Sequence, residues 1–130
     1  MVKKLLIISI LWAILILILS SIPGNSLPKA PTIPHFDKLV HAGLYFILSL
    51  FIIPVFDLTN NKIIRISAPV LIILIVILYG GFIEIAQENW FVNRKGDFKD
   101  FYSDIAGGIL AIILYYTLLK KPIVRWSGKK

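Results

Sequence analysis

Acidic side chains and a histidine occur at regular spacing near the first connection between apolar segments of this 130-residue sequence. His41 follows Asp37 by four residues and Tyr45 follows it by eight, so a helix would place all three on one face. A histidine beside a carboxylate can act as an oriented general base, and its ring can also bind a metal ion. We therefore take Asp37 and His41 as candidate catalytic residues and Tyr45 as a candidate binding residue.

A second polar group begins near residue 84 and repeats at helical spacing. Its candidate catalytic residues are Glu84 and Asp100, and its candidate binding residues are Gln87, Arg94, Asp97 and Asp104. Carboxylates and a histidine could hold a hard divalent cation such as Mg²⁺ or Ca²⁺. An arginine could hold an anionic lipid headgroup. The two groups together indicate a binding or catalytic site.

Ordinary structural roles are open to the same residues. Asp37 could cap a helix, Glu88 could mark the wet end of one, and Asp100 and Asp104 suit the positive end of a helix dipole. The chain has no cysteine, and it lacks the Walker, HExxH and GxSxG motifs. Whether the protein is an enzyme therefore stays open.

The elements that must position these residues are four uncharged segments: Leu5–Ile22, Leu39–Phe56, Ile66–Ile83 and Ile105–Leu119. Hydrophobic residues make up 58% of the chain, and its mean hydropathy is +0.85. A soluble domain of this size cannot bury so much apolar surface. Period-two alternation is absent, so we predict an all-α integral membrane bundle. It forms one domain, 1–130, with four transmembrane helices at about 5–22, 38–56, 66–86 and 102–119.

The first segment could instead be a signal peptide, because Lys3 and Lys4 precede it. Its length and the poor cleavage site at Ser20–Gly24 favour a retained helix. Small residues at Gly107, Gly108 and Ala111 predict close packing of the fourth helix.

Positive charge predicts the orientation of the bundle. Of the 14 lysines and arginines, nine lie at the termini and in the 57–65 connection, and five lie in the 23–38 and 84–104 connections. The positive-inside rule then places both termini in the cytoplasm and the candidate site outside. No basic stripe interleaved with aromatics exists, so we expect no nucleic-acid partner. The inner halves of the helices carry no comparable polar set, which disfavours a transporter unless the protein oligomerises.

Taken together, four motifs resemble the VanZ-like membrane protein family over positions 20 to 111. They are Asp37-Lys38-x-x-His41-x-x-x-Tyr45, Glu84-x-x-Gln87, Arg94-x-x-Asp97-x-x-Asp100 and Asp104-x-x-Gly107. The chain departs from the family at Asp104, where Asn is usual, and at Ala111, where Gly is common. The resemblance implies a multi-pass protein of the bacterial cytoplasmic membrane and gives no established reaction. The family takes its name from a member associated with low-level resistance to the glycopeptide teicoplanin.

Our leading hypothesis is an outward-facing site that binds or acts on a lipid-linked or cell-envelope ligand. His41 with Asp37 would be the base or ligand, and Glu84, Asp100 and Asp104 would hold a metal or a proton. Arg94 would hold an anionic headgroup. The alternative is a non-catalytic module whose polar residues are structural or bind a partner, and a small transporter acting as an oligomer comes third.

Overall fold

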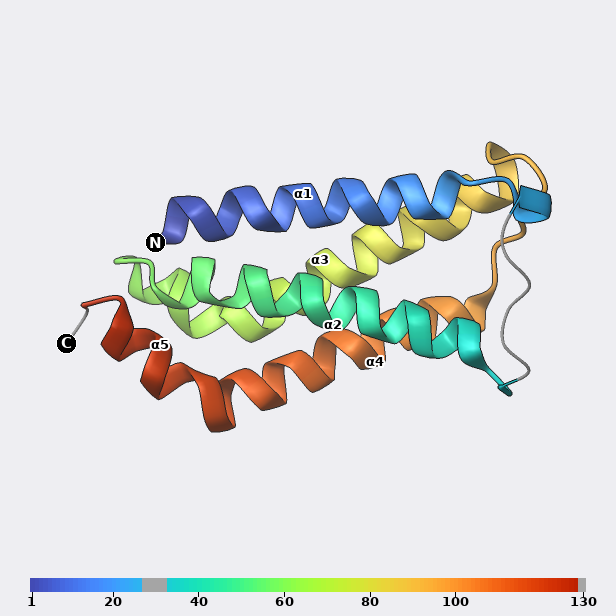
Figure 1. The fold of residues 1–130 in the computed structure, drawn as a ribbon. Coiled ribbons are helices and arrows are strands. Elements are labelled where there is room, and N and C mark those ends of the chain that lie inside the picture. The colour runs from blue at the N-terminus through green and yellow to red at the C-terminus, as the bar shows by residue number, and fades with distance from the viewer. Residues whose placement is uncertain (27–32, 129–130) are drawn as a thin grey trace.

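The computed structural model describes residues 1–26 and 33–128, and helices make up most of these two ranges (Figure 1). In chain order the helices are α1 (Val2–Ser21), the 3₁₀ helix η1 (Gly24–Ser26), α2 (Phe36–Asp57), α3 (Lys62–Asn89), α4 (Phe98–Leu114), the π-helical segment η2 (Tyr115–Leu119) and α5 (Lys120–Trp126). The last three run on as one helix from Phe98 to Trp126. No strand occurs in the described ranges.

Four of these helical stretches are long and apolar enough to cross a membrane. They are α1, α2, α3 and the continuous helix Phe98–Trp126. The predicted all-α bundle of four transmembrane helices is thus confirmed, and the length and composition of the helices make the chain a multi-pass membrane protein.

Every helix begins before the residue predicted for it, because an apolar run marks only the part that enters hydrocarbon. Backbone hydrogen bonds continue into the charged ends until a cap stops them. The Asn61 side chain accepts hydrogen bonds from the backbone N–H groups of Ile63 and Ile64 at the start of α3. The Asp97 side chain accepts one from the N–H of Lys99 at the start of α4.

Asp37, one candidate for the cap of the second helix, does not occupy the cap position. α2 begins at Phe36 and its N-cap residue is His35, which has a positive φ of 58° and makes no side-chain cap bond. Asp37 instead lies inside the first turn, where its negative charge suits the positive end of the helix dipole.

The bundle is held most tightly between α2 and α4, while α1 packs on α2 and touches α3 (Figure 1). The close packing predicted for the fourth helix is confirmed. A Cβ atom at Gly107 would overlap the carbonyl group of Ala42, and one at Gly108 would come within 3.1 Å of Val76 Cγ2. Small residues thus let α4 lie directly against the backbone of α2.

An aliphatic core fills the middle of the bundle. Its fully buried members include Ile16, Leu48, Ile53, Ile72 and Val76. The start of α1 and helix α5 lie at one end of this core, and η1 and the start of α2 lie at the other (Figure 1). The charged side chains of the described helices therefore lie toward the two ends of the bundle.

Candidate functional site

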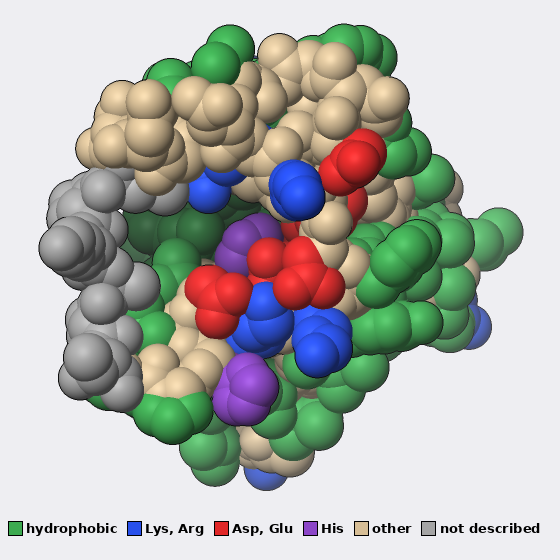
Figure 2. All heavy atoms as spheres, turned by 90° about the vertical axis from the view of Figure 1, so that its right-hand side faces the viewer, with side chains coloured by type: hydrophobic (Ala, Val, Ile, Leu, Met, Phe, Trp, Pro, Cys, Tyr) green, Lys and Arg blue, Asp and Glu red, His purple; other side chains and the backbone are tan. Residues whose placement is uncertain are grey.

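Charged side chains and a histidine gather in the middle of the end face that carries the start of α2 (Figure 2). Contacts join seven residues there: Asp37, Lys38 and His41 of α2, Glu84 of α3, Asp97 of the connection, and Asp100 and Asp104 of α4. We call these seven residues the polar cluster. It unites three helices that are far apart in the sequence.

Lys38 is the cation at the centre of the outer part of the cluster. Its Nζ lies 2.6 Å from Asp37 Oδ2, 2.8 Å from Asp97 Oδ2 and 2.8 Å from Asp100 Oδ1. The ammonium group of Lys38 and the backbone N–H of Lys99 hold the pKa of the Asp97 carboxyl below its usual range. Lys38 therefore ties the start of α2 to the start of α4.

His41 and Asp104 form the buried part of the cluster. Nδ1 of His41 lies 3.0 Å from Oδ1 of Asp104, whose side chain is fully buried. Nε2 of His41 lies 3.8 Å from Oδ2 of Asp100. The predicted partner Asp37 is bonded to Lys38, so Asp104 is the carboxylate that orients the imidazole ring.

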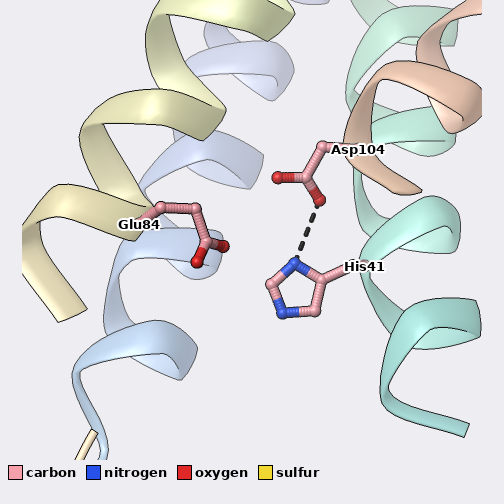
Figure 3. A group of neighbouring side chains, drawn as sticks. All are labelled: His41, Glu84 and Asp104. Atoms are coloured by element: carbon pink, nitrogen blue, oxygen red, sulfur yellow. Dashed lines mark hydrogen bonds and ion pairs between the residues drawn. The ribbon is translucent and has the colours of Figure 1, made fainter. Parts of the chain in front are cut away.

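Glu84 approaches this pair from α3 (Figure 3). Its Oε2 accepts a 2.7 Å hydrogen bond from the N–H of Asp97, while its Oε1 is buried and has no hydrogen-bond partner among the described residues. His41, Glu84 and Asp104 each offer one donor atom, and these three atoms lie within 4.8 Å of one another. Such a set could hold a divalent cation.

Gln87 and Arg94 are the predicted site residues that bond to α1. Gln87 Nε2 donates to the Ser20 carbonyl oxygen at 3.4 Å. Arg94 donates from Nε to Ile22 O at 2.9 Å and from Nη2 to Leu19 O at 3.0 Å. The last carbonyl groups of a helix lack partners in the helix itself, so these donors satisfy the end of α1. No contact joins the Arg94 guanidinium to the polar cluster in the described ranges.

Tyr45 lies one helical turn deeper than His41. Its side chain is buried, its ring packs against Tyr79 with centroids 6.0 Å apart, and its hydroxyl has no hydrogen-bond partner among the described residues. Ser49, one further turn along α2, also has a buried, unpartnered hydroxyl. Our sequence reasoning missed Ser49, although its spacing of four from Tyr45 was a usable signal.

A second polar group at the other end of the bundle was also missed. Asp57 is buried and accepts hydrogen bonds from Tyr115 at 3.1 Å, Tyr116 at 3.5 Å and Lys120 at 3.0 Å. The expectation that the inner halves carry no comparable set is therefore wrong. Ile53 of the aliphatic core lies between Ser49 and Asp57 on α2, so the core separates the two groups.

A groove opens beside the polar cluster, between α3 and the start of α4. Its lining residues are Gly81, Glu84, Ile85, Glu88, Asn89, Gly96, Asp97, Phe98 and Phe101. Phe98 is 81% exposed and Ile85 is 58% exposed, so one wall is apolar and faces outward from the bundle. Glu84 therefore belongs both to the groove and to the polar cluster.

No protein-family model, curated protein or solved structure matches this chain.

Proposed function

We propose that this chain is a VanZ-like membrane protein whose polar cluster binds, or acts on, the polar part of a lipid-linked or cell-envelope ligand. The observation that carries the proposal is the position of Glu84. Its carboxylate faces His41 and Asp104 on one side (Figure 3), and it lines the groove on the other. A molecule lying in the groove would therefore reach the cluster without crossing the core.

The composition of the groove fits an amphiphile. Exposed Phe98 and Ile85 can contact acyl or isoprenoid chains, whereas Glu88 and Asn89 can contact a hydrated headgroup. Residues at the end of a membrane-spanning helix sit at the depth where lipid headgroups meet hydrocarbon. The groove thus suits a ligand that arrives from the bilayer.

The orientation that we propose places both termini in the cytoplasm of a bacterial cell and the polar cluster at the outer surface of the cytoplasmic membrane. It is supported by Lys3, Lys4, Lys62 and Arg65, which lie at the starts of α1 and α3, on the side away from the cluster. A ligand exposed to the cell envelope would then meet the groove directly.

The chemistry open to the cluster is general base catalysis. When Nδ1–H of His41 donates to Asp104, Nε2 carries the lone pair and can accept a proton from a ligand hydroxyl or water. Glu84 and Asp100 would stabilise the imidazolium that forms. Asp104 acts here as a positioning residue.

One observation favours the non-catalytic alternative. Lys38 is bonded to three carboxylates from two helices and a connection, which is how a cluster with a purely structural role would be built. The unpartnered oxygens of Glu84 and Asp104 distinguish the inner part of the cluster from this paired outer part.

Blocking the groove tests the proposal. A side chain at Gly81 would start 3.7 Å from Phe101 and extend into the groove, so Gly81→Leu should remove lipid that co-purifies with the protein. A Cβ at Gly43 meets no atom within 4 Å, which makes Gly43→Leu the matched control. Native mass spectrometry of the two variants should show bound lipid-linked species only for Gly43→Leu. Equal lipid in both would contradict the groove as the binding site.

A further inference from the structure

His41, Glu84 and Asp104 converge from three different helices on one small volume (Figure 3). One donor atom of each lies within 4.8 Å of the others. Donors on opposite sides of a bound Mg²⁺ or Ca²⁺ lie about 4 to 5 Å apart, and neighbouring donors lie closer. The three side chains can therefore reach a common ion with small rotations.

Two carboxylate oxygens at this point have no hydrogen bond within the described part of the chain. Oδ2 of Asp104 belongs to a side chain with 0% exposure, and Oε1 of Glu84 is also buried. In Figure 3 the Asp104 oxygen that is not bonded to His41 points toward the α3 side, from which Glu84 approaches. Buried polar atoms are nearly always satisfied by protein, water or an ion, so these oxygens indicate a ligand.

The charge of the cluster indicates the sign of that ligand. Asp37, Asp97 and Asp100 share the single ammonium group of Lys38. Glu84 and Asp104 then have only the imidazole ring of His41 for compensation among the cluster residues. An anion would be repelled there, whereas one divalent cation would neutralise both carboxylates.

We propose that His41, Glu84 and Asp104 form a site for a divalent cation. One imidazole nitrogen beside two carboxylates suits a first-row transition metal such as Mn²⁺ or Zn²⁺, which binds nitrogen and oxygen donors together, better than Mg²⁺ or Ca²⁺, which favour oxygen donors. The sequence led us to expect Mg²⁺ or Ca²⁺ from a larger set of carboxylates and a histidine. The structure brings together only one imidazole and two carboxylates, and this larger share of nitrogen changes the preference. The ion would leave positions open toward the groove, where an anionic headgroup could complete its coordination.

Only the role of the ion toward a headgroup rests on the proposed function. The binding of the metal itself is measured on protein that carries no lipid ligand, so it is tested independently. The purified, chelator-treated protein in detergent is titrated with Mn²⁺, Zn²⁺, Mg²⁺ or Ca²⁺, and the melting temperature and binding stoichiometry are recorded. Mn²⁺ or Zn²⁺ should bind one per chain and raise the melting temperature, since a ligand that binds only the folded state stabilises it.

Two variants test the site itself. Glu84→Gln keeps an oxygen for the N–H of Asp97, so it should fold and lose at least ten-fold in metal affinity. Asp57→Asn removes one negative charge at the other end of the bundle and keeps an oxygen for the Tyr115 hydroxyl, so it should bind metal like the natural chain. Absence of binding by all four ions, or equal affinity in both variants, would overturn the cation site. Neither result would affect lipid binding in the groove, which the Gly81→Leu comparison measures separately.

Discussion

Nδ1 of His41 lies 3.0 Å from Oδ1 of Asp104, and this contact joins α2 to α4 across 63 residues of sequence. The other oxygen of the same carboxylate is fully buried and unpartnered among the described residues. One carboxylate thus orients the imidazole with one oxygen and offers the other to a ligand. The proposed base chemistry and the proposed cation site both depend on this arrangement. They are alternative uses of His41, because the lone pair of Nε2 can accept a proton or bind an ion but not both at once.

Substitutions of Asp104 should separate these two uses. Asp104→Asn keeps an oxygen that can accept from Nδ1–H of His41, so the fold should be retained while cation affinity falls. Asp104→Ala removes the acceptor and leaves a void against α3, which should lower the free energy of unfolding by about 1–3 kcal/mol. Thermal unfolding in detergent without metal measures the difference. Equal stability of the two variants would show that the bond to His41 does not hold the helices.

Lys38 should stabilise the bundle by neutralising carboxylates on α2 and α4. Lys38→Met leaves Asp37, Asp97 and Asp100 to repel one another, and it should lower the free energy of unfolding by about 1–3 kcal/mol. Added salt should recover part of the loss, because ions screen like charges. Lys99→Met, at an exposed position of the same region, serves as the control and should change stability little. A similar loss in both variants would argue for a general charge effect.

Gly107 should be required for the contact between α2 and α4. A Cβ atom there would overlap the Ala42 carbonyl, so even Gly107→Ala should force the two helices apart. We expect a loss of about 1–3 kcal/mol or more in the free energy of unfolding, and a smaller monodisperse peak in size-exclusion chromatography. Gly43→Ala, in open space, should behave like the natural chain. Normal stability of Gly107→Ala would mean that the helices are less tightly packed than described.

The orientation can be tested cleanly because the chain has no cysteine. Val92→Cys places a thiol at an exposed position of the connection after α3, and Lys62→Cys places one at the start of α3. A membrane-impermeant maleimide added to intact cells should label the first and spare the second until the membrane is opened. The reverse pattern would place the polar cluster in the cytoplasm and exclude a ligand that approaches from outside.

Local patterns in the sequence predicted much of the fold and part of the site. Hydropathy identifies segments that enter a bilayer, and helical spacing places residues such as Glu84 and Gln87 at one end of a helix. Local spacing does not show which side chains from segments far apart in the chain come into contact, so these contacts could not be predicted. The spacing of four between Asp37 and His41 suggested that the two side chains pair with each other. In the structure Asp37 instead pairs with Lys38, the next residue in the chain, and His41 pairs with Asp104 of α4.

Arg94 and Asp57 show the same limit. Arg94 had the chemistry of a headgroup ligand, yet its position beside the end of α1 directs it to backbone carbonyl groups. Asp57 is the last residue of α2, and its partners Tyr115 and Lys120 follow about 60 residues later in the chain. Only the packing of α2 against the helix after α4 reveals its partners.

The proposal that the polar cluster serves a lipid-linked or cell-envelope ligand is tested most directly in the organism that encodes this chain. A deletion strain is complemented with the natural chain, with His41→Ala or with Gly43→Leu, and lipid-linked and cell-wall species are compared by mass spectrometry. Teicoplanin susceptibility is recorded in the same strains. We predict that one species accumulates in the deletion strain and with His41→Ala, at equal protein level in the membrane, and returns to normal with the other two chains. Lipid and cell-wall profiles that do not change on deletion would contradict the account.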